Sequence, residues 1–197
     1  MPEPLTGHYA RLLALGAAAF PHVAGSLAPH LLRTASLLQR WGNRPALCLA
    51  GLYHAVYGTD GIRGSLVSLN HRRAIVDLIG NDAESITYLY GACDRGAFHP
   101  RVGTGASWQF VDRFTRSEYP IDDAALRDFC ELSLANELEL ALSSDAFLIK
   151  HRGDLAQLAE RMRPYVSASA RDACSGMLAV RPFDSGGARA PHVRDTP

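Results

Sequence analysis

Three histidines, His22, His30 and His54, are the residues of this chain whose type and spacing best suit chemistry. Histidine binds metal ions and exchanges protons near neutral pH, so three imidazoles in one pocket would indicate a catalytic or metal site. His22 and His30 are separated by a little over two helical turns and would share one face of a continuous helix. A short turn would let the next helix bring His54 back to them. We therefore predict that the three histidines line one catalytic pocket.

Other polar side chains are predicted to complete this pocket. Tyr57 follows His54 by about one helical turn and could return a proton that a neutral histidine has taken from a substrate. Arg33 follows His30 by three residues and could bind a carboxylate or phosphate group. The alternative for each is an ordinary role, as a buried hydroxyl or a surface ion pair. The predicted substrate-binding residues are Arg33, Tyr53, Asp112, Arg113 and Asn136.

Two of these assignments depend on the local pattern. Asp112 and Arg113 follow a long glycine-containing loop, and a pocket lid and a buried ion pair are equally good interpretations of the pair. Asn136 and Glu137 are neighbours on a predicted helix and must point about 100° apart. We place Asn136 toward the histidines because leucines flank it at one-turn spacing on the apolar face.

The elements that must position these residues are helices. Apolar residues recur at helical spacing through most of the chain, and no strand-like alternation is evident, so the predicted fold class is all-α. His22 and His30 fall in a predicted helical stretch over 21–42, whose strongest part begins after Ser26 as N-cap. We predict one domain over residues 1–180 and a disordered or loosely packed tail over 181–197. The other predicted helices span residues 4–20, 46–56, 70–79, 124–143 and about 154–165 or a little beyond. A turn over 80–84 is predicted to lead into a further helix that ends at residue 94.

Composition and charge argue against several classes of partner. Twenty basic residues balance twenty acidic ones, so no nucleic-acid partner is expected and a small molecule is the default ligand. No apolar run is long enough to span a membrane, and the N-terminal segment lacks the basic start of a signal peptide. We therefore expect a cytoplasmic protein. The four cysteines are far apart in the sequence, and we expect them to be free and buried. The apolar helix over 4–20 predicts either a core position or a homodimer contact, and we expect a homodimer.

His30 on one helix, His54 on the next and Asn136 on a late helix resemble the site of the HD-domain superfamily. That resemblance implies an HD-like helical bundle, and metal-dependent hydrolysis or dinuclear iron chemistry. In this chain Ala55 follows His54 where the superfamily carries aspartate, and Asn136 stands at its last aspartate. The segments 22–42, 50–59, 78–84, 112–115 and 135–137 look more closely like a small HD-like family without an assigned activity. This likeness covers most of residues 20–145.

The loss of two carboxylates changes the metal chemistry that the resemblance implies. Carboxylates offset divalent charge and bridge paired metals, so a dinuclear site is not expected here. One Zn²⁺ or Fe²⁺ held by His30, His54 and either His22 or Asn136 stays open, and so does a site without metal. We predict a small-molecule enzyme that uses metal-assisted or general acid/base hydrolysis, elimination or cyclisation. The alternatives are a mononuclear non-haem iron oxygenase and a non-catalytic ligand-binding protein with a decayed HD site.

Overall fold

The computed structural model of the chain describes residues 5–22, 25–61, 64–105 and 109–179. The prediction of an all-α fold is confirmed, with two short antiparallel hairpins added to the helices. The predicted tail over 181–197 lies outside the described residues. The helices are α1 (Leu5–Ala14), α2 (Leu27–Arg40), α3 (Pro45–Tyr53), α4 (Arg72–Ala92), α5 (Arg95–Phe98), α6 (Asp123–Ser143), α7 (Asp145–Met162) and α8 (Ala168–Ala179), with 3₁₀ turns η1 (Leu69–His71) and η2 (Arg163–Tyr165). The hairpins pair β1 (Pro21–His22) with β2 (Gly25–Ser26), and β3 (Phe110–Asp112) with β4 (Ser117–Tyr119).

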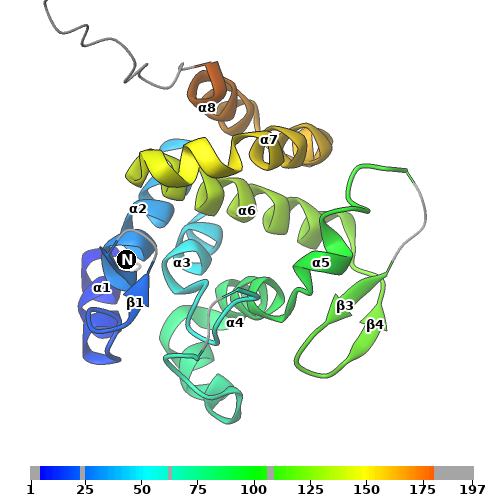
Figure 1. Cartoon of the computed structure of the whole chain (residues 1–197). Coiled ribbons are helices and arrows are strands. Elements are labelled where there is room, and N and C mark those ends of the chain that lie inside the picture. The colour runs from blue at the N-terminus through cyan, green and yellow to red at the C-terminus, as the bar shows by residue number, and fades with distance from the viewer. Residues whose placement is uncertain (1–4, 23–24, 62–63, 106–108, 180–197) are drawn as a thin grey trace, which may run out of the picture.

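Helix α6 is the central element of the fold. In Figure 1 it lies between α2 and α3 on one side and α7 and α8 on the other. The side chain of Asp122 caps its N-terminus by accepting a hydrogen bond from the backbone N–H of Ala125. From Phe129 to Ala141 only Glu137 is not fully buried, so α6 meets neighbours on nearly every face. Polar side chains at these positions must therefore find partners inside the protein.

The close packing of α2 against α3 brings two of the predicted site histidines near each other. The buried face of α2 carries Leu31, Ala35 and Leu38 at helical spacing, while α3 is apolar throughout. At Gly51 the two helices nearly touch, because an added Cβ would lie 2.4 Å from Cδ1 of Leu38 and 3.4 Å from Cα of Ala35. A side chain at position 51 would therefore require the buried Leu38 side chain to move.

Several predicted boundaries need correction. His22 lies on the strand β1, not on the helix of His30, because the chain forms a tight hairpin before α2 begins. The single last helix predicted over 154–165 is wrong, since α7 begins at Asp145 and α8 follows it. The predicted turn over 80–84 is confirmed only at Gly80, whose φ of 82° and ψ of 159° interrupt α4, whereas residues 81–84 are helical.

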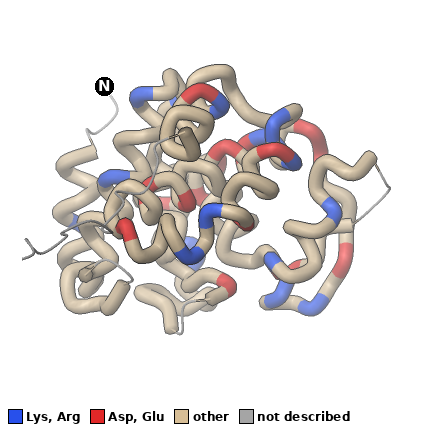
Figure 2. Tube along the Cα trace, turned by 45° about the horizontal axis from the view of Figure 1, so that its top comes forward, with Lys and Arg blue, Asp and Glu red and all other residues tan. Residues whose placement is uncertain are grey.

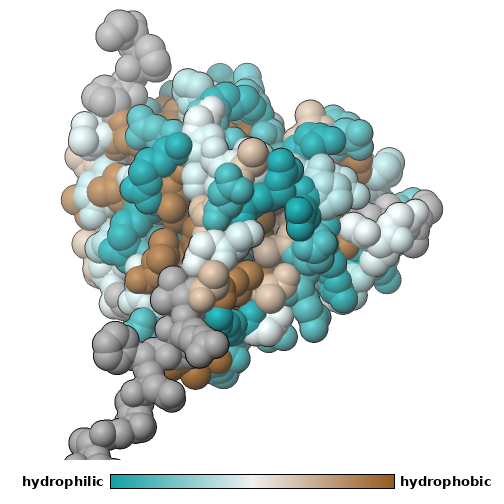
Figure 3. All heavy atoms as spheres, turned by 90° about the horizontal axis from the view of Figure 1, so that it is seen from above, coloured by the Kyte–Doolittle hydropathy of each residue, from teal (hydrophilic) through white to brown (hydrophobic). Residues whose placement is uncertain are grey.

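The surface shows no single charged face among the described residues. Figure 2 shows basic and acidic residues interspersed along the trace, and Figure 3 shows hydrophobic patches separated by hydrophilic residues on the face it presents. The four cysteines are free and buried, as predicted. In the described part of the chain, no helix is long and apolar enough to cross a membrane. Helix α1 buries His8 and Leu12, while Leu13 is 40% exposed, and the homodimer stays a prediction.

Candidate functional site

The centre of the candidate site is a buried ion pair between His30 of α2 and Glu139 of α6. Nδ1 of His30 bonds to Oε2 of Glu139, and the two side chains are only 1% and 2% exposed. Glu139 also accepts hydrogen bonds of 2.5 Å from Nε of Arg33 and from the hydroxyl of Ser143. Burial raises the pKa of Glu139, but the bonds from His30, Ser143 and Arg33 outweigh it and bring the pKa to about 2. Glu139 is therefore a carboxylate at neutral pH and holds the His30 ring in one orientation.

The other nitrogen of His30 faces two hydrogen-bond acceptors. Its Nε2 lies 3.3 Å from Nε2 of His54 and 3.0 Å from Oδ1 of Asn136. His54 donates its Nδ1 hydrogen to the carbonyl of Gly51 at 2.7 Å, which leaves its Nε2 as a bare acceptor. Asn136 donates its amide to Glu137 at 3.2 Å, so its oxygen faces His30.

The hydrogen-bond pattern favours a hydrogen on Nε2 of His30. If Nε2 of His30 carried no hydrogen, three buried lone pairs would converge without a donor, which is costly. A hydrogen on Nε2 satisfies both acceptors, while the hydrogen on Nδ1 satisfies Glu139. With a hydrogen on each ring nitrogen, His30 would donate to the Glu139 carboxylate on one side and to Asn136 and His54 on the other.

His22 covers this cluster from the hairpin. Its ring stacks on that of His30, with a centroid separation of 4.2 Å and an interplanar angle of 22°. Burial, followed by the charge of His30, lowers the pKa of His22 to about 4, so His22 is neutral near pH 7. Its Nδ1 is buried and has no hydrogen-bond partner among the described residues. The structure thus brings His22, His30 and His54 together, by a hairpin rather than by the predicted continuous helix.

His54 is fixed by the elements around it. It is the C-cap of α3, and its ring meets Tyr90 of α4 edge-on with a centroid separation of 5.2 Å. The pKa of His54 lies well below its ordinary value because of burial first and the charge of His30 second. Two of the three imidazoles, those of His22 and His54, are therefore neutral near pH 7.

The structure places Tyr57 and Tyr53 in other contacts. Helix α3 ends at Tyr53, so the helical spacing that predicted Tyr57 above His54 does not continue that far. The hydroxyl of Tyr57 instead donates to Glu84 at 2.8 Å, and Arg72 donates two bonds to the same carboxylate. The hydroxyl of Tyr53 lies 3.4 Å from Nδ1 of His8. Tyr53 thus links α3 to α1, and Tyr57 links the turn after α3 to α4.

Of the remaining residues predicted to bind substrate, some lie beside His30 and others make structural contacts elsewhere. Asp112 is the buried last residue of β3, and it accepts hydrogen bonds from the backbone N–H groups of Phe114 and Thr115 and from the hydroxyl of Tyr88. Arg113 donates to the carbonyl of Gly91 rather than to Asp112, so this pair is not an ion pair. We call His22, His30, His54 and Glu139 the His30 cluster. Of the predicted substrate-binding residues, only Asn136 and Arg33 contact this cluster directly.

Glu139 is the functional residue that the sequence interpretation missed. It lies three positions after Asn136 on α6, and residues at this spacing share a helical face. A carboxylate on the face that carries Asn136 was therefore a detectable signal. The apolar flanking residues make that face look like ordinary core, and Glu137, directly beside Asn136, was the more conspicuous carboxylate.

The fit of a metal ion can be judged from the donor atoms. The separations of 3.3 Å and 3.0 Å from Nε2 of His30 to His54 and Asn136 suit neighbouring ligands around one tetrahedral cation. The described residues contain no group of three His, Cys, Asp or Glu side chains arranged to hold a metal. Two imidazoles and one amide would thus have to hold the ion, with Glu139 orienting His30 from behind.

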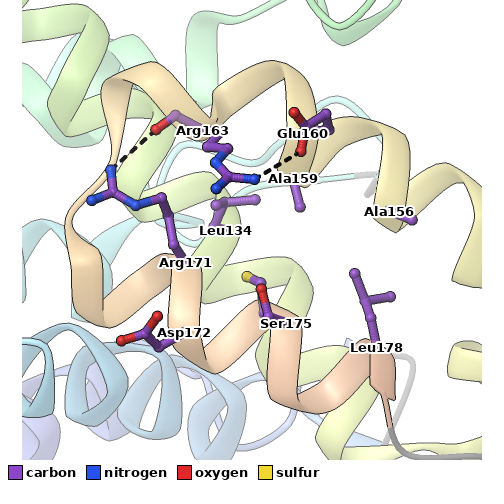
Figure 4. A pocket seen from close by; sticks show the side chains of 10 residues that line it. Leu134, Ala156, Ala159, Glu160, Arg163, Arg171, Asp172, Ser175 and Leu178 are labelled. Atoms are coloured by element: carbon purple, nitrogen blue, oxygen red, sulfur yellow. Dashed lines mark hydrogen bonds and ion pairs between the residues drawn. The ribbon is translucent and has the colours of Figure 1, made fainter.

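A cavity lies between α6, α7 and α8, and none of the described residues that line it belongs to the His30 cluster. Figure 4 shows this pocket of about 180 Å³, with Leu134 and Ser175 in its wall. Its two arginines already have partners: Arg163 lies 3.5 Å from Glu160, and Arg171 donates to the Arg163 carbonyl at 3.3 Å. The described residues that line it include no histidine, so it is a weaker candidate for proton chemistry than the His30 cluster.

Comparison with known protein families matches residues 11–95 to a domain of unknown function, DUF6817. The matched region contains His22, His30 and His54 but ends before α6, which supplies Asn136 and Glu139. No curated protein matches the chain. No solved structure matches it either.

Proposed function

We propose that the protein is a small-molecule enzyme of the hydrolase or lyase type whose proton-transfer group is His30. The observation that carries this proposal is the buried Glu139–His30 pair, with Nε2 of His30 directed at His54 and Asn136. A carboxylate that fixes the tautomer and charge of an imidazole is the arrangement that general acid/base catalysis uses. The same cluster supports the HD-like interpretation of the fold.

His22 and His30 would each carry out one half of a proton exchange. Neutral His22, which is only partly buried and has a free buried Nδ1, is placed to accept a proton from a substrate. His30 holds a proton on Nε2 and can return one to the departing or newly formed group. The proton removed and the proton supplied balance, which suits elimination, cyclisation or the addition of water.

The first experiment is a conversion assay with a matched control. Purified protein is incubated with fractionated small-molecule extracts, and mass spectrometry follows compounds that gain or lose one water or change retention at constant mass. Conversion should be lost in His30→Gln and kept in His71→Gln, because His71 is exposed on η1. Equal conversion by both variants would overturn the assignment of His30.

The protonation pattern gives an independent check. At pH 7, ¹⁵N spectra of the imidazole rings should show two protonated nitrogens for His30 and one each for His22 and His54. A singly protonated His30 in the intact protein would contradict the hydrogen-bond pattern on which the proposal rests.

A second candidate is catalysis assisted by one Zn²⁺ or Fe²⁺, which the ligand-like spacing of His30, His54 and Asn136 favours. Such an ion would supply a Lewis acid and a bound water of lowered pKa. Protein purified without chelator should then contain about one metal per chain, and His54→Ala should lose it. The oxygenase alternative fits less well, because the carboxylate of the cluster, Glu139, contacts Nδ1 of His30 and not the side shared with His54.

A further inference from the structure

A pocket beside the turn that follows α3 contains a fixed arginine. It has a volume of about 380 Å³, and its wall includes Tyr57, Ser65, Val67, Ser68, Arg113 and Phe114. We call it the Arg113 pocket. Neither its residues nor their partners belong to the His30 cluster, so a ligand in this pocket does not depend on the enzymatic function proposed for that cluster.

The guanidinium of Arg113 is held in one orientation. Its Nε donates to the carbonyl of Gly91 at 2.7 Å, and its Cζ lies 4.3 Å from the centroid of the Phe114 ring. The backbone N–H of the same residue bonds to the carbonyl of Ala92 at 2.8 Å. A guanidinium fixed through Nε and through one face still has its two terminal nitrogens to offer.

Those terminal nitrogens have no partner among the described residues. The adjacent carboxylate, Asp112, is used by Tyr88 and by the backbone of its own turn. Arg72, nearby in the fold, shows the opposite case, because both its Nε and its Nη2 bond to Glu84. Burial lowers the pKa of Arg113, and the charges of Asp60 and Asp112, which act in the opposite direction, do not offset it.

The rest of the pocket complements a bound anion. Ser65 and Ser68 add hydroxyl groups, and since Ser68 accepts the N–H of Asn70 through its oxygen, its own hydrogen is available to donate. Tyr57 and Val67 add apolar surface. No acidic residue is among the described residues that line the pocket.

We propose that the Arg113 pocket binds the oxyanion of a small organic molecule, a carboxylate or a phosphate, against the terminal nitrogens of Arg113 and the hydroxyls of Ser65 and Ser68. A guanidinium presents two parallel N–H donors that match either group. The apolar wall favours a ligand whose anion is attached to a hydrocarbon body.

The test is a titration of the full-length protein with phenyl phosphate, phenylacetate, inorganic phosphate and phenethylamine, followed by ¹H–¹⁵N NMR and calorimetry. One or both organic anions should bind, with saturable shifts at Arg113 Nε–H and at the amides of Ser65 and Ser68, and phenethylamine should not. Arg113→Gln should weaken binding by about tenfold or more, the loss of a charge-assisted bidentate contact. Arg116→Gln is the matched control, since Arg116 is exposed in the same hairpin and should leave affinity unchanged.

Two further arms keep the result decisive. Ser65→Glu adds a negative charge at an exposed wall residue, so it should abolish anion binding without disturbing the fold. Tighter binding of phenyl phosphate than of phenylacetate assigns a phosphate ester, and the reverse assigns a carboxylate. The proposal is overturned if neither organic anion shifts these signals, if inorganic phosphate binds as tightly as phenyl phosphate, or if Arg116→Gln weakens binding as much as Arg113→Gln.

Discussion

Replacement of Glu139 by glutamine should destabilise the protein by about 2–4 kcal/mol at pH 7. The carboxylate accepts bonds from His30, Arg33 and Ser143, and hydrogen bonds to a charged group are worth roughly 1.5–3 kcal/mol each. Glutamine keeps the size and one oxygen but turns an amide toward a donor and removes the charge that His30 needs. Arg33 adds little to this estimate because its side chain is 46% exposed and solvent screens it.

A double-mutant cycle isolates the ion pair from the other effects. Urea unfolding of the wild type, Glu139→Gln, His30→Gln and the double variant should give a coupling energy of roughly 1.5–3 kcal/mol, since each single change leaves the other partner unmatched in the interior. Glu160→Gln is the control: Glu160 is 74% exposed and pairs with Arg163, so its loss should cost no more than about 0.5 kcal/mol. A Glu139→Gln cost below about 1 kcal/mol, or a coupling energy near zero, would refute the view that this pair organises the cluster.

Three further predictions concern pH, backbone and thiols. The pKa of His22 falls from 6.5 to about 4 on folding, so the unfolded chain binds more protons between these values. The free energy of unfolding should therefore fall by about 1–2 kcal/mol from pH 7 to pH 5, after allowance for solvent screening. An unchanged midpoint of urea unfolding would contradict this prediction. Gly58→Ala should lower the free energy of unfolding by more than about 2 kcal/mol, because the φ of Gly58 is 78° and an added Cβ would lie 2.4 Å from the Gly64 carbonyl oxygen. Gly153→Ala, whose added Cβ would have nothing within 4 Å, should raise it by about 0.5–1 kcal/mol in the same thermal or urea measurement. Burial raises the pKa of Cys93 to about 12 and also raises the pKa of Cys130. Ellman's reagent should therefore label these thiols slowly in the native protein and at once in the urea-unfolded protein. Rapid labelling of the native protein would be evidence against the burial of these cysteines.

Local sequence patterns were sufficient to predict the central helices. Helix α6 is nearly as expected because Asp122 caps it and the apolar residues after it keep helical spacing. The proximity of His30 and His54 was also predictable, since α2 and α3 are joined by a short turn and α3 has no polar face. The position of Asn136 beside His30 followed from one-turn spacing on α6.

The remaining features depend on contacts that local periodicity does not encode. His22 lies beside His30 because β1 and β2 pair as a hairpin. Each of these strands has two residues, which is too short to give an alternating pattern. Tyr57 does not lie beside His54 as expected, because α3 ends at Tyr53. Its hydroxyl instead donates a hydrogen bond to Glu84 on α4. The start of α7 was missed because Ser143–Ser144 looked like the end of a helix, whereas Ser144 caps the next one.

The distance along the chain between His30 and Glu139 has a consequence for the order in which the protein is made. The two residues are 109 positions apart, so during synthesis α2 and α3 leave the ribosome long before α6 exists. In that interval His30 lacks the carboxylate that stabilises its charged form beside His54. The ion pair can close only when α6 docks, so its formation marks the moment at which a nascent chain passes from a helical hairpin to a complete fold. A probe of the His30 ring would therefore report the completion of folding itself.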